Sequence, residues 1–183
     1  LRPVCRGGST NRPTIGHRQG TDMAWPTIIQ GGMGVAISDW RLARTVAMAG
    51  QLGVVSGTGI APVMIRRLMD GDPDGDTRRA LAHFPSPDIA QRVIDTYFLP
   101  NGRGRGKPYR PHPTLTISPS RAAIELSLAA NFAEVWLAKQ GQDGVVGINM
   151  LEKVQTANAS AILGAMLVIE LAALIDRNGA YKN

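Results

Sequence analysis

The sequence has little cysteine and few aromatic residues. Cys5 is its only cysteine among 183 residues, and aromatics make up 5%. A single cysteine excludes an intramolecular disulfide and a cysteine-built zinc site, so we expect a reducing, cytoplasmic setting and no bound metal. Hydrophobic residues reach 44% and charged residues 19%, a balance typical of a globular chain. This length suits one domain or part of a larger one.

Signatures of nucleic-acid-binding and membrane proteins are also missing. The net charge is +6, but much of the excess lies near the N-terminus and in "NGRGRGKPYRPHP" at 101–113. Neither segment interleaves aromatics in the pattern of an RNA-binding sheet or has a zinc-finger or helix-turn-helix signature, which favours solvated loops over a nucleic-acid partner. The apolar run at 158–179 is broken by Glu170 and is short beside the roughly 20 apolar residues of a spanning helix. We therefore predict a buried helix there and no membrane contact.

Residues 1–22 form a basic, polar stretch without the apolar core of a secretory signal. Met23 follows, directly before the first apolar run. We expect residues 1–22 to be a disordered leader and the working protein to begin near Met23. Mass spectrometry of the native N-terminus would test this.

Apolar runs that end in small residues alternate with helical patterns. Buried strands are predicted at 26–30, 52–59 and 143–151, and helices at 40–49, 61–71, 119–141 and 158–179. This order is typical of βαβ units, so the predicted fold class is α/β with a parallel sheet. Two short amphipathic helices and a basic loop, at about 75–115, form a predicted helical insertion over one end of this frame.

Small residues recur where the predicted strands end, in "QGGMG", "SGTG" and "GINML". Ligands of parallel α/β folds bind at the carboxyl ends of the strands. A tight turn explains any one of these segments, whereas a planar ligand across the edge explains all three, because glycine lets the backbone approach a ring. The spacing of a dinucleotide fingerprint and the lysine of a P-loop are both missing, so neither is predicted.

These motifs resemble a known family. "IIQGGMG", "LGVVSGTG", "ANFAEVWLAKQGQDGVVGINMLEKVQ" and "GAML" are similar to the N-terminal part of the nitronate monooxygenases, formerly called 2-nitropropane dioxygenases. The resemblance covers about residues 26–167. It implies the first three or four βα units of a partial (β/α)8 TIM barrel that binds FMN. It also implies an oxidoreductase that oxidises alkyl nitronates with dioxygen through a flavin radical.

The resemblance further implies an FMN site at the carboxyl face of the barrel. Met33 would pack on the isoalloxazine ring, Asn149 would hydrogen-bond its polar edge, and Lys153 would place charge near that edge. The implied cofactor-binding residues lie in or just after the three strand-end segments: Gln30, Gly31, Gly32, Met33, Gly34, Ser56, Gly57, Asn149 and Lys153.

The residues by themselves leave alternatives open. Met33 could fill a gap in the core, Asn149 could cap a turn, and Lys153 could be solvated. His83 and His112 lie in the insertion at no spacing that suggests catalysis, so we interpret both as structural or surface residues.

The resemblance ends near Leu167, and residues 168–183 form a divergent tail where the family continues into another strand. The family's catalytic histidine and phosphate site come from later strands, and no residue here matches them, so the catalytic residue stays unknown. We expect residues 23–167 to be the N-terminal part of the barrel in a truncated form, with an unpaired edge that promotes self-association.

Three functions follow as hypotheses. The first is oxidation of a small-molecule nitronate. The resemblance implies this activity for the family and leaves it open for this chain. The second is a flavin-dependent enoyl-acyl-carrier-protein reductase-like activity on an acyl substrate, which pyridine-nucleotide oxidation would distinguish. The third is a non-catalytic fragment or interaction module.

Overall fold

The computed structural model describes the backbone of residues 26–178 and the side chains of residues 26–169. The predicted leader at 1–22 lies outside the described residues. The elements, in chain order, are α1 (Trp40–Met48), β1 (Gly53–Ser56), α2 (Ile60–Met69), α3 (Asp76–Leu81), α4 (Pro87–Tyr97), α5 (Arg121–Lys139), β2 (Val146–Asn149) and α6 (Gln155–Asn178). The fold is therefore mixed α/β, as predicted.

The small sheet is parallel. β1 pairs with β2 so that Gly53 lies opposite Val146 and Ser56 opposite Asn149. The predicted first strand is reduced to one parallel bridge between Ile29 and Leu52 on the other side of β1. All three predicted strands therefore lie side by side and run in one direction.

The predicted burial of two strands is wrong. Ile29 is 66% exposed, and Ile28 is similarly open, because no described side chain covers this segment. The residues of β2 are half-buried, whereas those of β1 are fully buried between its two neighbours. An apolar β-branched run predicts a strand, but only its covering elements decide how deeply it is buried.

Side-chain caps set where two of the helices begin. The carboxylate of Asp39 accepts hydrogen bonds from the N–H groups of Arg41 and Leu42, which starts α1 as predicted. The hydroxyl of Ser120 accepts from Ala123 N at 3.2 Å and starts α5 at Arg121. The predicted start at Pro119 is wrong, because the capping hydroxyl lies one residue beyond the proline.

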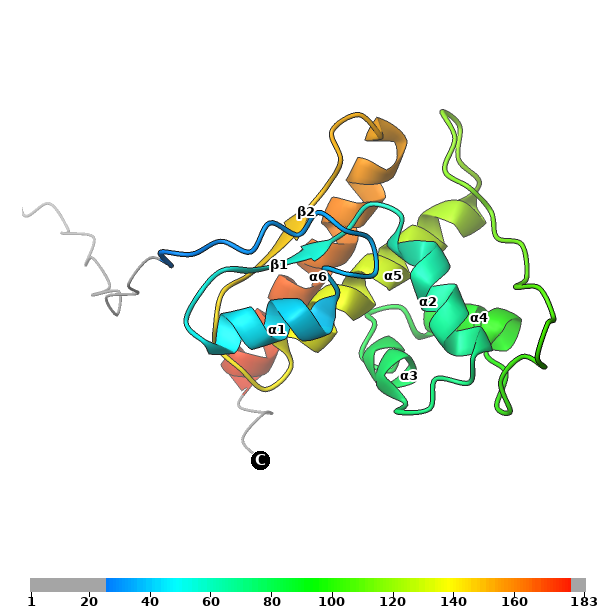
Figure 1. The fold of residues 1–183 in the computed structure, drawn as a ribbon, viewed down its shortest axis with the longest axis horizontal. Helices are drawn as coiled ribbons and strands as arrows, with labels where there is room; N and C mark the ends of the chain where they lie inside the picture. The colour runs from blue at the N-terminus through cyan, green and yellow to red at the C-terminus, as the bar shows by residue number, and fades with distance from the viewer. Residues whose placement is uncertain (1–25, 179–183) are drawn as a thin grey trace, which may run out of the picture.

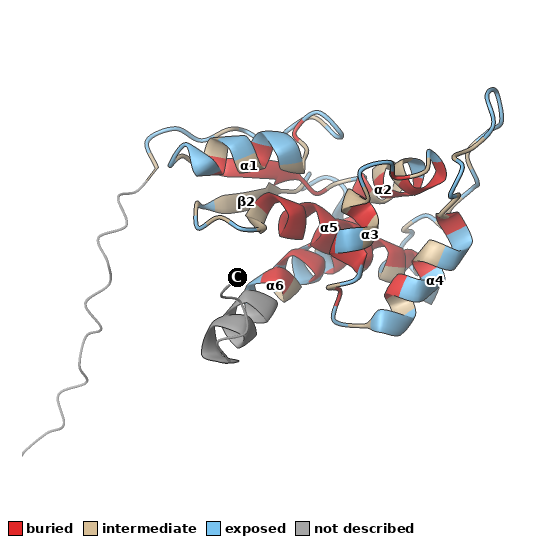
Figure 2. Ribbon diagram, turned by 90° about the horizontal axis from the view of Figure 1, so that it is seen from below, coloured by how far each residue is buried: buried red, intermediate tan, exposed pale blue. Residues whose placement is uncertain are grey.

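The core is built around α5. Figure 1 shows α5 running through the middle of the molecule, between α1 with the strands at one end and α2, α3 and α4 at the other. Buried residues gather along its length (Figure 2), and Phe132 and Leu137 are among the most deeply buried side chains. The insertion helices α3 and α4 pack against α2 and α5. They are part of the core, and only the loop after them reaches the end of the strands.

Among residues 26–178, none of the helices combines the length and the apolar character that crossing a membrane requires.

Candidate functional site

The ends of the predicted strands meet at one edge of the sheet. Ser56 and Asn149 are register partners at the ends of β1 and β2, and Gly57 N donates to Asn149 O at 2.8 Å. On the other side of β1, Gln30 N donates to Leu52 O at 3.0 Å. The structure therefore brings the three predicted strand-end segments together.

The side chain of Gln30 connects its segment to the rest of the fold. Its Nε2 donates to Ser38 Oγ at 3.1 Å, and its Oε1 accepts from Val54 N at 2.8 Å. Both ends of the carboxamide are therefore used inside the protein. Gln30 positions the glycine loop that follows it and does not present its amide to a ligand.

Asn149 holds the glycine loop Gly31–Gly34 in place. Its Nδ2 donates to the carbonyl oxygens of Gly31 and Gly32, at 3.2 and 3.4 Å. All described peptide bonds are trans, so the N–H that shares a peptide plane with each of these carbonyls points away from Asn149. Those are the N–H groups of Gly32 and Met33, and they donate to no acceptor among the described residues.

Packing explains two of the glycines. Gly32 has φ +62°, and a Cβ there would lie 2.5 Å from Val54 Cγ1. A Cβ on Gly57 would lie 2.6 Å from Ile148 Cδ1. At Gly31, by contrast, an added Cβ would meet only the Met33 side chain, at 3.6 Å. Internal packing thus requires Gly32 and Gly57, while Gly31 faces unfilled space.

Met33 lies on an exposed apolar surface. Its side chain is 82% exposed, so the alternative that it fills the core is wrong. Ile37 is exposed beside the same loop. Lys153 lies in the exposed turn after β2 and makes no ion pair with a described residue. The glycine loop therefore carries exposed apolar side chains and two N–H groups that have no acceptor among the described residues.

A cavity of about 220 Å³ adjoins this edge at the end of β1. His112, which we expected to be structural or at the surface, lies in its wall together with Asn131 of α5. The sequence offers one signal for Asn131, a polar residue within the apolar pattern of a long helix. It offers none for His112, because the long loop before α5 sets its position.

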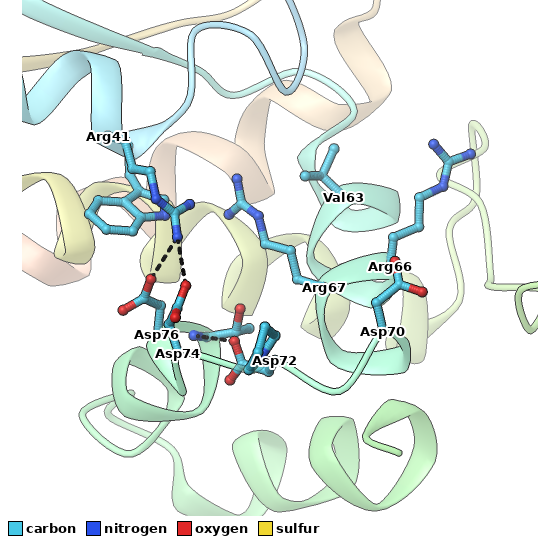
Figure 3. A pocket seen from close by; sticks show the side chains of 11 residues that line it. Arg41, Val63, Arg66, Arg67, Asp70, Asp72, Asp74 and Asp76 are labelled. Carbon is cyan, nitrogen blue, oxygen red and sulfur yellow. Dashed lines mark hydrogen bonds and ion pairs between the residues drawn. The ribbon is translucent and has the colours of Figure 1, made fainter. Parts of the chain in front are cut away.

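A second cavity, of about 280 Å³, lies between α1, α2 and α3 and is rich in charge. Figure 3 shows Arg41 reaching Asp76 and Asp74, at 2.9 and 3.6 Å. Arg67 meets the buried Glu134 at 2.6 Å. These charges pair largely with one another, and the described residues contain no group of acidic, histidine or cysteine side chains that could hold a metal ion. The cavity is therefore lined by part of an ion-pair network that joins α1 to α3 and α2 to α5.

No protein-family model, curated protein or solved structure matches the chain. Function has to be inferred from the geometry of the strand edge and from the motifs that form it.

Proposed function

We propose that the carboxyl edge of the strands binds FMN and serves an oxidoreductase of the nitronate monooxygenase type, which oxidises alkyl nitronates with dioxygen. The observation that carries the proposal is the glycine loop Gly31–Gly34, which Asn149 holds with unpaired N–H groups beside the exposed Met33. In the same proposal, the parallel strands are the first units of a partial (β/α)8 barrel.

The residues of the edge fit a flavin ring. An isoalloxazine has hydrogen-bond acceptors and one N–H donor along its polar edge and a methylated apolar end. The N–H groups of Gly32 and Met33 are donors for those acceptors. Asn149 lies on the opposite side of the loop from these N–H groups, so in this proposal it positions the loop for the ring. Met33 and Ile37 offer apolar contact to the ring.

Each residue has a separate role in this proposal. FMN supplies the redox chemistry when it is bound, and the chain orients it. Gln30 and Ser38 hold the start of the loop, while Asn149 holds its carbonyls away from the ring. The ammonium group of Lys153 offers positive charge at the polar edge. Ser56 and Gly57 would contribute from β1, and no residue is assigned to proton transfer or to the phosphate.

The first test is the visible spectrum of the purified chain after incubation with FMN and desalting. We expect flavin bands to remain with the protein. Oxygen uptake on addition of an alkyl nitronate then tests the reaction. Oxidation of NADH or NADPH with an enoyl thioester, without nitronate-dependent oxygen uptake, would favour the reductase instead. A colourless protein would contradict the FMN proposal.

A second candidate function, an interaction module, is favoured by exposed apolar side chains. Ile28 and Ile29 are exposed on a segment that pairs with described residues along one edge, and Leu163 and Met166 of α6 are about half exposed. The partner we propose is a second copy of the chain, joined through the unpaired strand edge. Both candidates keep the cytoplasmic setting that the single cysteine predicts.

Sedimentation over a range of concentrations tests self-association. We expect a dimer that dissociates on dilution, and we expect Ile29→Lys to shift the equilibrium to monomer. Ile117→Lys is the control, because Ile117 is also exposed, at 95% against 66% for Ile29, but lies in the loop before α5. A monomer at every concentration would contradict this candidate.

A further inference from the structure

The cavity at the end of β1 differs in character from the rest of the site. It is lined by the β1–α2 loop, the first turn of α2, the loop that contains His112, one face of α5 and the start of α6. Among the described residues, no aspartate, glutamate, lysine or arginine lines it, and His112 is the one titratable side chain in its wall. Its polarity therefore comes from amides, hydroxyls and backbone groups.

Asn131 contributes an unpaired acceptor to this cavity. Its side chain is 1% exposed, and its Nδ2 donates to the carbonyl oxygen of Ser127 at 2.9 Å. A carbonyl can only accept, so this bond orients the carboxamide and leaves Oδ1 as the buried oxygen without a partner. The oxygen lies close to the backbone of Gly57, where an added Cβ would be 2.9 Å from it, and Asn131 and Gly57 both line the cavity. A ligand with an O–H or N–H donor would satisfy this oxygen.

Two helix N-termini reach the same cavity without acidic residues of their own. Gly59 starts α2 with no side-chain cap, and the N–H groups of Ile60 and Ala61 have no acceptor among the described residues. Thr156 and Ala157, in the first turn of α6, also line the wall, and that turn is free of acidic side chains. Two positive dipole ends at a cavity without a carboxylate favour an anionic group.

We propose that this cavity binds a small hydroxycarboxylate. The carboxylate lies toward the first turns of α2 and α6, and the hydroxyl donates to Asn131 Oδ1. The volume of about 220 Å³ lies below the usual range for drug-sized ligands, so the ligand has few heavy atoms. Ile60 and Val154 in the wall suit a short hydrocarbon. Gly57 is shared with the proposed FMN site, whereas Asn131 and the first turns of α2 and α6 are not, so variants of those residues test this cavity separately.

Amide NMR of the full chain without flavin tests the site with two probes, glycolate and acetate. Both are small carboxylates, and only glycolate carries a hydroxyl donor. We expect glycolate to shift the amide signals of Ile60 and Ala61 and the side-chain signals of Asn131. Acetate should bind about tenfold more weakly, because it leaves the buried oxygen unpaired. Equal affinities, or no shift with glycolate, would overturn the proposal.

Variants test the binding of the carboxylate and of the hydroxyl separately. Ala61→Asp places a carboxylate in the first turn of α2, where it is favourable for the helix, so the protein should stay folded and lose glycolate binding. Asn131→Ala should reduce the preference for glycolate over acetate to nearly nothing. Asn158→Ala is the matched control, because Asn158 Oδ1 is also buried and unpaired but lies outside the cavity wall. If Ala61→Asp binds glycolate as the unaltered chain does, or if both asparagine variants behave alike, the proposal is wrong.

Discussion

The strand edge and the charged cavity between α1, α2 and α3 differ in whether their polar groups have partners. Between α1, α2 and α3, Arg67 meets Glu134 at 2.6 Å and Arg41 meets Asp76 at 2.9 Å, so the charges satisfy one another. At the strand edge, the N–H groups of the glycine loop have no described acceptor and Met33 is exposed. A ligand is therefore expected where polar groups have no hydrogen-bond partner in the protein, and not where charged side chains are most numerous.

The largest effect on folding should come from Glu134. Its carboxylate is 2% exposed, and it accepts from Trp40 N at 2.7 Å and from Arg67 at 2.6 Å. Replacement by alanine removes the close partner of the half-buried Arg67 guanidinium and leaves Asp39, 3.8 Å away, as its described ion-pair partner. We therefore expect Glu134→Ala to lower the free energy of unfolding by about 3–5 kcal/mol. Denaturant unfolding measures this, with FMN binding recorded where the variant stays folded.

Glu125→Ala is the control for that measurement. Glu125 also accepts from two arginines, but Arg92 and Arg121 are mostly exposed, and the expected loss is below about 1 kcal/mol. Similar losses for Glu134→Ala and Glu125→Ala would show that the buried network is not what holds the helical end together.

Asn149→Ala should have an intermediate effect on folding and a local one on the loop. The variant frees the carbonyls of Gly31 and Gly32, at an expected cost of about 1 kcal/mol. NMR order parameters of the backbone should fall in Gly31–Gly34 and stay unchanged in α5. The same variant should weaken FMN binding. Unchanged order parameters in the loop would mean that Asn149 does not position it.

The pH dependence of stability should include a small contribution from Glu125. Hydrogen bonds from Arg92, and next from Arg121, hold its pKa below the usual value of 4.5. A lowered pKa in the folded state stabilises the protein above the unfolded value, and this stabilisation is lost as the pH falls through the folded value. Glu125→Gln should reduce the difference in unfolding free energy between about pH 7 and about pH 3 by less than roughly 1 kcal/mol. A larger difference in the variant would contradict this sign.

Met33→Ala should have the smallest effect on folding, and it tests directly whether the strand edge binds FMN. Its side chain makes few contacts, so the free energy of unfolding should change by less than about 0.5 kcal/mol. FMN affinity should fall several-fold if Met33 packs on the ring. Met48→Ala is the matched control, since Met48 is also exposed but lies at the far end of α1. Equal FMN affinities in the two variants would show that Met33 does not contact FMN.

The sequence predicts the order of the elements well, because that order follows from local patterns. The helices at Trp40–Met48 and Gln155–Asn178 follow from apolar spacing, and the cap at Asp39 follows from its residue type. Burial is harder to predict. Ile28 and Ile29 have the composition of a buried strand, yet they are open, because burial depends on which other elements cover a segment.

The candidate site was predictable in its position and not in its details. Parallel strands bring their carboxyl ends together, so Gln30, Ser56 and Asn149 could be expected to lie near one another. The side-chain amides of Gln30 and Asn149 form hydrogen bonds within the protein. These bonds depend on the loop geometry, which no motif encodes. Asn131 and His112 reach their cavity only through tertiary packing, which places residues from distant segments in one wall.

The most direct test of the account is amide NMR of the full chain during titration with FMN. The account predicts the largest shifts at Gly31, Gly32 and Met33, with smaller shifts at Asn149 and none in α3 or α4. Saturable binding whose shifts fall instead on the charged cavity between α1, α2 and α3, or no shift at the glycine loop, would contradict the claim that the strand edge is the functional site.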